Sequence, residues 1–175
     1  KDKKWHKIYK YINEEIPSGT KIFKKKKKKN KFDFEEVMMK KPENKFESYK
    51  NALGTLGGGN HFIEINSGLE NDYIVIHSGS RKFGLDVCTY YNKMMKFDSD
   101  RYRIDLDEAL KSIEPHERQE FIKKFKAEYN RNANILTGEK AKEYLNDMKI
   151  AQHFASENRK IMIKKMLEFF SIRVK

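Results

Sequence analysis

The chain has 175 residues and carries 38 Lys and Arg against 26 Asp and Glu, which gives a formal net charge of +12 at pH 7. This surplus favours polyanionic partners such as nucleic acid or an anionic membrane surface, although a well-solvated, lysine-rich surface would give the same count. The single cysteine, Cys88, excludes a disulfide within the chain and suits a reducing compartment, here the cytoplasm or the nucleus. No apolar run approaches the ~20 residues of a membrane-spanning helix, and the length fits one compact domain.

The N-terminal part of the chain combines a helical pattern with a run of lysines. Apolar residues recur every three or four positions over residues 4–16, which predicts a short amphipathic helix that Pro17-Ser18-Gly19 ends. Lys24–Lys29 form an unbroken run of like charges that Lys31 continues, and such a run repels itself and rarely packs. Residues 23–32 are therefore expected to form a mobile loop, which either touches RNA phosphates or is simply solvated.

Two segments in the middle of the chain have the composition of strands. Asn60–Ile65 and Tyr73–His77 are rich in β-branched and aromatic residues, with a turn expected at Asn66-Ser67-Gly68. Residues 98–136 are charged and mostly helical in pattern, and we interpret them as a surface insertion. The expected fold class is α+β, with a mixed central β-sheet and helices packed on it.

A long helix is expected after Gly138. Its apolar positions keep helical spacing, which indicates ordinary core packing. These positions are Leu145, Met148, Ala151, Phe154, Ala155, Ile161, Ile163, Met166 and Phe170.

The chemistry is expected to lie in the glycine-rich segment Gly57-Gly58-Gly59-Asn60-His61. Three consecutive glycines weaken any regular element, so they indicate either a simple turn or a close approach of the backbone to a ligand. Glycine N–H groups can cradle an anion, Asn60 adds a donor and an acceptor, and His61 opens the following strand. In a regular strand His61 and Glu64 would point to opposite faces, so both serve one site only if the strand ends or bends there.

A second segment of the same character is His77-Ser78-Gly79-Ser80-Arg81. His77 ends an apolar strand, and Ser80 is a candidate N-cap for the helix that follows. A helix N-terminus attracts anions, and the guanidinium of Arg81 is a forked donor for phosphate. Either histidine alone is compatible with a structural role, with metal binding or with acid–base chemistry. The two together, each flanked by glycine at a strand end, favour a shared metal site.

These segments resemble the signatures of the RtcB family of RNA ligases. The first signature is matched by Leu53-Gly54-Thr55-Leu56-Gly57-Gly58-Gly59-Asn60-His61-Phe62-Ile63-Glu64, and the second by Ile76-His77-Ser78-Gly79-Ser80-Arg81. A third, helical block is matched by Tyr144–Met148, Ala151–Ala155 and Asn158-Arg159, and residues 8–20 resemble the stretch before the glycine motif. The resemblance covers residues 8–20, 46–97 and 139–160.

The resemblance implies an enzyme that joins an RNA 3′-phosphate or 2′,3′-cyclic phosphate end to a 5′-hydroxyl end, using GTP and two Mn²⁺ ions. A histidine attacks the α-phosphate of GTP, the GMP passes to the RNA 3′-phosphate, and the 5′-hydroxyl then displaces it. By motif match His61 and His77 would bind manganese. The guanylate would contact Asn60, Phe62 and Glu64, and an RNA phosphate would contact Ser80 and Arg81. The partners implied are tRNA halves or broken RNA and GTP, with no membrane; an activating protein is left open.

The chain also departs from the family pattern. The family's metal-binding cysteine belongs upstream of the glycine motif, whereas Cys88 follows the second motif and is expected to be a small buried hydrophobe. The guanylylated histidine and a third metal-binding histidine belong beyond the helical block, and His153 lies inside that block. Lys82 replaces a small glycine. We therefore expect a central slice of the enzyme, either a fragment or a truncated and inactive protein. The alternatives are a non-catalytic RNA-binding remnant and a different manganese-dependent phosphoryl-transfer or hydrolytic enzyme.

Overall fold

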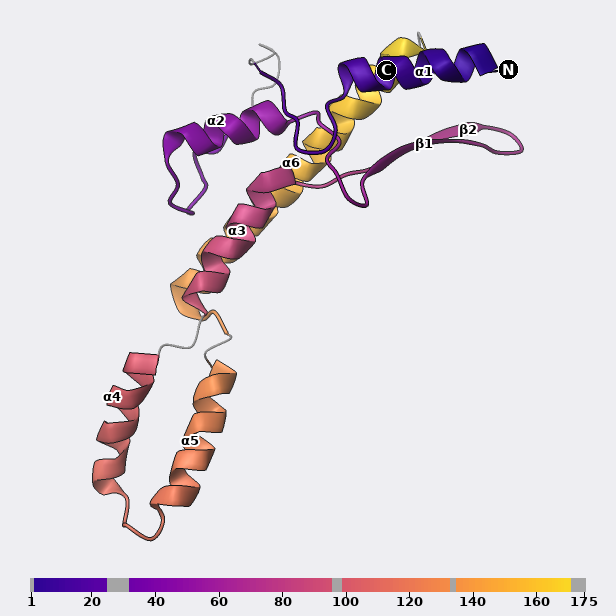
Figure 1. Cartoon of the computed structure of the whole chain (residues 1–175). Coiled ribbons are helices and arrows are strands. Elements are labelled where there is room, and N and C mark those ends of the chain that lie inside the picture. The colour runs from indigo at the N-terminus through magenta and orange to yellow at the C-terminus, as the bar shows by residue number, and fades with distance from the viewer. Residues whose placement is uncertain (1, 25–31, 96–98, 133–134, 171–175) are drawn as a thin grey trace.

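The structure, a computed structural model, describes residues 2–24, 32–95, 99–132 and 135–170 (Figure 1). Its helices are α1 (Asp2–Glu15), α2 (Glu43–Ala52), α3 (Arg81–Met94), α4 (Ser99–Ala109), the short 3₁₀ helix η1 (Leu110–Ser112), α5 (Arg118–Asn132) and α6 (Gly138–Phe169). The strands β1 (Phe62–Ser67) and β2 (Asp72–His77) pair in antiparallel fashion. This mixture confirms the expected α+β class, and the sheet of the described residues is this one hairpin.

The long helix α6 is the axis on which the rest of the body assembles. Gly138 begins it with φ +58, and good helix formers then continue it over 32 residues. In Figure 1, α3 runs beside its first half, whereas α1 and the β-hairpin lie against its second half. The expected long helix is therefore confirmed. Among the described helices, none combines the length and the apolar character that a membrane crossing requires.

Two apolar clusters lie on α6 and hold the neighbouring elements. The first joins α6 to α2, α3 and the segment before α2, and its fully buried side chains include Tyr49, Phe83, Tyr91 and Phe154. The second joins α6 to α1 and the β-hairpin through Ile8, Ile16, Ile76, Met162 and Met166. Burial of such side chains contributes roughly 1.5–3 kcal/mol each, and these two clusters fix the hairpin and α3 relative to one another.

The register of the hairpin decides which of its faces stays open. Ile63 pairs with Ile76 and Ile65 with Ile74, and these four side chains pack toward the second cluster. The pairs Phe62–His77, Glu64–Val75 and Asn66–Tyr73 occupy the other face, which is exposed. The chain turns after β1, where the Gly68 N–H donates to the Asn71 carbonyl at 2.9 Å. The turn spans residues 68–71, so the turn expected at residues 66–68 begins two residues too early, because β1 continues to Ser67.

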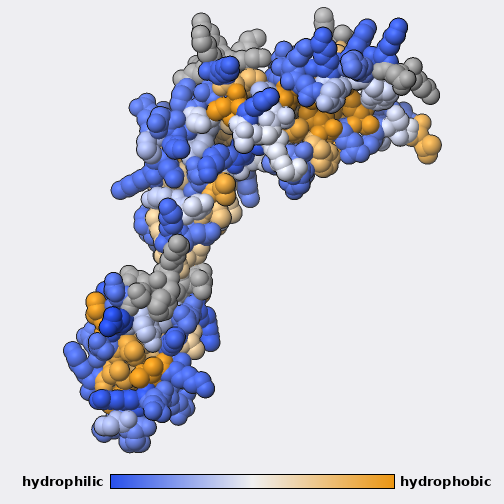
Figure 2. All heavy atoms as spheres, in the orientation of Figure 1, coloured by the Kyte–Doolittle hydropathy of each residue, from blue (hydrophilic) through white to orange (hydrophobic). Residues whose placement is uncertain are grey.

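The charged segment around residues 98–136 is helical, as expected. In Figure 1, α4 and α5 form a hairpin that projects away from the body, and Figure 2 shows apolar side chains on its visible face. Its two helices meet through rings of Tyr102, Phe125 and Tyr129. No described side chain between residues 99 and 132 is buried. That this hairpin is an insertion stays a prediction.

Two local predictions need correction. Of the expected lysine-rich loop at residues 23–32, residues 25–31 lie outside the described part of the chain. Phe32, however, is only 7% exposed and packs on Phe154 with ring centroids 5.1 Å apart, because an aromatic ring gains more from the core than from solvent. Cys88 was expected to be buried, but it is exposed and lines a hollow between α3 and α6 together with Tyr144 and Met148.

Candidate active site

Three segments that are distant in the sequence meet where the glycine motif leaves α2. The segment Pro17–Gly19 runs beside the glycine motif: the Leu56 N–H donates to the Pro17 carbonyl at 2.9 Å, and the Gly19 N–H donates to the Gly57 carbonyl at 2.7 Å. The third segment, Ser78–Arg81, connects β2 to α3. The motifs that the sequence singled out therefore form one continuous surface.

His61 and His77 face each other on this surface. Their ring centroids are 5.9 Å apart, a separation at which one ion between the rings can be bound by both. His77 ends β2 and stacks on Phe62, with centroids 5.4 Å apart and an interplanar angle of 16°. His61 comes immediately before β1, so the alternation of the strand does not govern its direction. The expected conflict between His61 and Glu64 is thereby resolved, because the strand begins after the histidine.

The surroundings of His61 favour the neutral form of its imidazole. Burial lowers its pKa from the ordinary value, and the charges of Arg81 and His77 lower it further, against a smaller opposing effect of the Gly58 backbone. Its Nδ1 atom is buried without a hydrogen-bond partner. Because Nδ1 lies on the side of Gly57 and the Arg81 guanidinium, a divalent metal ion would bind at the other ring nitrogen, Nε2. His61 and His77 would be two of its ligands; no group of three or more His, Cys, Asp or Glu side chains gathers in the described chain.

Arg81 joins all three segments. Its Nε donates to the Thr55 hydroxyl at 3.0 Å, and its Nη2 donates to the Gly19 carbonyl at 2.8 Å. The residue has φ +57, a conformation that costs a non-glycine residue about 1–2 kcal/mol and that is often found at functional sites. Burial lowers the pKa of its guanidinium, which stays cationic at neutral pH because an arginine pKa starts so high.

Gly57 makes the close packing of His61 and Arg81 possible. It has φ +102, and a Cβ at this position would overlap both the guanidinium of Arg81 and the ring of His61. Two features therefore require a glycine at this position: the positive φ of its backbone, and the lack of space for a Cβ atom beside Arg81 and His61. This observation supports the interpretation of the glycine segment as part of a site rather than as a simple turn.

The other predicted site residues lie around this centre. Phe62 and Glu64 share the exposed face of the hairpin with His77, and Asn60 is exposed in the turn before β1. Ser80 stands at the N-cap position of α3, but its side chain makes no capping hydrogen bond. The expected capping role is wrong, since Ser80 has φ −76 and ψ 8 instead of the extended conformation of a capping residue. Its hydroxyl lies instead against Gly84 in the first turn of α3.

A pocket of about 570 Å³ adjoins His61 and Arg81. The side chains that line it carry the positive charges of Arg81 and Lys82, hydroxyl groups and apolar surface, but no carboxylate. The lining residues are Gly19, Thr20, Ile22, Ser48, Ala52, His61, Gly79, Ser80, Arg81, Lys82 and Leu85. Its charge suits a phosphate-bearing ligand.

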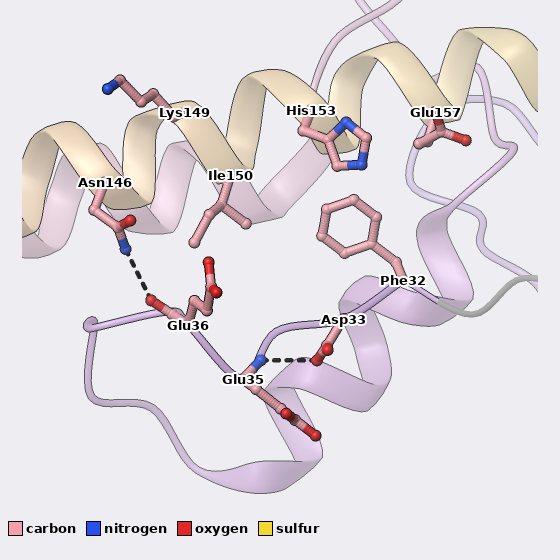
Figure 3. A pocket seen from close by; sticks show the side chains of 9 residues that line it. All are labelled: Phe32, Asp33, Glu35, Glu36, Asn146, Lys149, Ile150, His153 and Glu157. Carbon is pink, nitrogen blue, oxygen red and sulfur yellow. Dashed lines mark hydrogen bonds between the residues drawn. The ribbon is translucent and has the colours of Figure 1, made fainter.

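A larger pocket of about 730 Å³ lies between α6 and the segment before α2 (Figure 3). It contains His153, whose ring lies 5.4 Å from that of Phe32, and its charged lining is mainly acidic. The carboxylates are Asp33, Glu35, Glu36 and Glu157, against the single cation Lys149. Such a lining repels phosphate, so this pocket does not compete with the pocket at Arg81 for a nucleotide or an RNA end.

The sequence motifs included two further residues, Asn158 and Arg159, to which no function was attached. Both come from α6: Asn158 is fully buried beneath the glycine motif, and Nη1 of Arg159 donates to the Ser78 carbonyl at 2.9 Å. The sequence contains a sign that Asn158 is important. This polar residue interrupts the apolar stripe of a long helix, at a position where the helical spacing predicts a buried side chain. Burial of a polar group costs free energy unless partners satisfy it, so it implies a specific set of contacts.

The imidazole pair, the cationic pocket and the glycine turn lie together on one surface, and imidazole and guanidinium groups are side chains suited to metal ions and phosphate groups. Comparison of the whole sequence identifies the family: the profile of the tRNA-splicing ligase RtcB family matches residues 1–175, and the chain belongs to this family. No solved structure matches the chain.

Three archaeal relatives, each described as tRNA-splicing ligase RtcB, show the extent of the similarity. The protein of Methanocaldococcus jannaschii is 33% identical over 90 residues, which are 43% of this chain and 9% of the relative. The Methanococcus maripaludis protein is likewise 33% identical over 90 residues, 43% of this chain and 19% of the relative. The Pyrobaculum aerophilum protein is 28% identical over 137 residues, 69% of this chain and 24% of the relative. The chain thus spans less than a quarter of the length of these relatives.

Proposed function

We propose that this chain supplies part of the active site of an RNA ligase that joins an RNA 3′-phosphate or 2′,3′-cyclic phosphate end to a 5′-hydroxyl end, as in tRNA splicing or RNA repair. The observation that carries the proposal is the pair of imidazoles of His61 and His77, with ring centroids 5.9 Å apart, beside a pocket whose charged side chains are cationic. Membership of the tRNA-splicing ligase family supports the same assignment.

In the proposed reaction, GTP loses pyrophosphate as a histidine nitrogen bonds its α-phosphorus, and the GMP then passes to an oxygen of the RNA 3′-phosphate. The 5′-hydroxyl oxygen then bonds the phosphorus of that RNA 3′-phosphate, its proton leaves to solvent, and GMP departs. A 2′,3′-cyclic phosphate end enters the same steps after water has opened it to a 3′-phosphate. Manganese ions would polarise the phosphoryl oxygens and neutralise developing charge. The guanylylated histidine and the remaining metal ligands are proposed to come from other parts of the complete enzyme.

The described residues have distinct tasks in this proposal. His61 and His77 would hold the metal through ring nitrogens, and Arg81 would present its remaining N–H groups to a phosphate. Phe62 and Glu64, on the open face of the hairpin, are proposed to contact the guanylate together with Asn60. Ser80 lines the same pocket as Arg81 and would contribute its hydroxyl group to the RNA phosphate.

A labelling assay tests the proposal. The chain and any longer product of the gene are incubated with α-labelled GTP and Mn²⁺, and covalent guanylylation is measured. Labelling of the longer product but not of this chain is the expected result, and absence of label from every longer product contradicts the ligase assignment. RNA binding without labelling would instead support a non-catalytic remnant, and Mn²⁺-dependent hydrolysis without labelling would support a different phosphoryl-transfer enzyme.

A further inference from the structure

The middle of α6 contains a fully buried amide, Asn158, that lies against the start of the glycine motif and the turn after β2. Asn158 is 0% exposed and follows Phe154 and precedes Met162 on the buried face of the helix. A buried amide without hydrogen-bond partners would cost roughly 1–3 kcal/mol of folding free energy. The partners of Asn158 therefore identify the segments that this side chain connects.

The amide of Asn158 bonds to both segments that carry the histidines. On the side of the glycine motif, its Oδ1 accepts from the N–H groups of Gly54 at 2.6 Å and Thr55 at 3.1 Å, and its Nδ2 lies 3.1 Å from the Thr55 carbonyl. On the side of β2, the same Nδ2 donates to the Ser78 hydroxyl at 3.0 Å and to the Gly79 carbonyl at 3.2 Å. One side chain therefore cross-links the start of the glycine motif to the turn after His77.

The neighbouring Arg159 adds a further hydrogen bond from α6, to the Ser78 carbonyl, and apolar contacts of Ile161 with Gly54 and of Met162 with the cluster around Ile76 lie beside the link. The Ser78 hydroxyl extends the link by donating to the Leu56 carbonyl at 2.7 Å. The hairpin register pairs Phe62 with His77 and so places the two histidines side by side. Asn158 holds the backbone on either side of that pair, before His61 and after His77, so a shift of one segment on α6 would turn the two rings relative to one another.

We propose that Asn158 is a positioning residue that sets the separation of His61 and His77 and thereby the affinity of the site for a divalent metal ion; this rests on the proposed function. The amide is suited to the task because it offers an acceptor to two N–H groups and donors to three oxygens. An aspartate would place a carboxylate against those oxygens, and a leucine of similar size would lose every bond.

The test compares Asn158→Asp and Asn158→Leu with a matched control, Asp147→Asn. Asp147 lies earlier on the same helix and is also 0% exposed, but its carboxylate accepts from Met38 N–H, Met39 N–H and the Tyr91 hydroxyl, far from the histidine segments. Both kinds of substitution remove buried hydrogen bonds from α6. The Asn158 variants loosen the contacts of α6 with residues 54–55 and 78–79, whereas Asp147→Asn loosens its contacts with residues 38–39 and with Tyr91.

Two quantities are measured on the full chain: the affinity for Mn²⁺, and the rate of backbone amide hydrogen exchange in the absence of metal. Both are measured at a temperature at which each variant is folded. The Asn158 variants are expected to bind Mn²⁺ about 10–100-fold more weakly, as for other residues that orient metal ligands, and to exchange faster at residues 54–61 and 77–81. Asp147→Asn is expected to keep the wild-type affinity and to exchange faster near residues 36–39. Should both Asn158 variants fail to fold, Ser78→Ala removes one bond of the link and is expected to weaken Mn²⁺ binding by a smaller factor.

Wild-type Mn²⁺ affinity in the folded Asn158 variants, or in Ser78→Ala, would overturn the proposal, and so would an equal loss in Asp147→Asn. A His61→Ala variant separates this failure from failure of the proposed function. If the wild-type chain does not bind Mn²⁺, or if His61→Ala leaves Mn²⁺ binding unchanged, the assignment of the metal site is wrong. The proposed metal-positioning role of Asn158 is then wrong as well. Faster exchange confined to the two segments would then assign Asn158 a structural link alone.

Discussion

Replacement of Gly57 by alanine is the sharpest perturbation of the site. The residue has φ +102, and a Cβ there would overlap Arg81, whose Cζ would lie 2.9 Å away, and the ring of His61. The backbone conformation costs an alanine about 1–2 kcal/mol. Displacement of the guanidinium breaks its hydrogen bonds to Thr55 and Gly19, each worth about 1 kcal/mol.

Gly57→Ala is therefore expected to lower the free energy of unfolding by about 3–4 kcal/mol, which for a chain of this size corresponds to a fall in Tm of about 10 °C. Thermal unfolding followed by circular dichroism measures it. Mn²⁺ affinity should fall as well, because His61 moves with Arg81. Gly59→Ala is the matched control: Gly59 also has positive φ, +71, but nothing lies within 4 Å of a Cβ there.

The control should show only the conformational cost of about 1–2 kcal/mol and a nearly unchanged Mn²⁺ affinity. Equal losses of stability in the two variants would refute the packing of Arg81 and His61 over Gly57. An unchanged Mn²⁺ affinity in a destabilised Gly57→Ala would show that this packing does not position the metal ligand.

Three further predictions concern other parts of the molecule. Burial raises the pKa of the Asp86 carboxyl group, but hydrogen bonds from Tyr49 and Lys82 outweigh burial and lower this pKa below 3.8. The ionised carboxylate of Asp86 therefore stabilises the folded state above pH 3.8, and this stabilisation is lost as pH falls through the lowered pKa. Acid unfolding of Asp86→Asn should show a shallower pH dependence below pH 4, and an unchanged slope would contradict this. Replacement of residues 99–132 by a short flexible linker should leave the stability of the body and its Mn²⁺ affinity unchanged, as measured by calorimetry and titration; a large loss would show that the hairpin supports the core. Cys88 should react with a thiol reagent in the native protein as fast as in the unfolded protein, whereas slow native labelling would contradict its exposure.

Sequence patterns predicted the local elements because local interactions decide them. Helical spacing located α1 and α6, and β-branched residues bounded by glycine located β1 and β2. The patterns were less successful where burial depends on a partner. Leu145 keeps the helical spacing of α6 yet is 49% exposed, whereas Met162, which the pattern omitted, is fully buried.

For the site, the sequence by itself predicted which residues carry the chemistry: the glycine turn, His61, His77 and Arg81, whose types and order resemble the family signatures. Only the tertiary structure decided how these groups act on one another. The register of the hairpin places the imidazoles 5.9 Å apart, and contacts between separate segments lower the pKa of His61 and anchor Arg81. Asn158 shows most clearly why the tertiary structure is needed. Its five hydrogen bonds go to residues distant in the sequence, so the sequence alone does not reveal what the amide contacts.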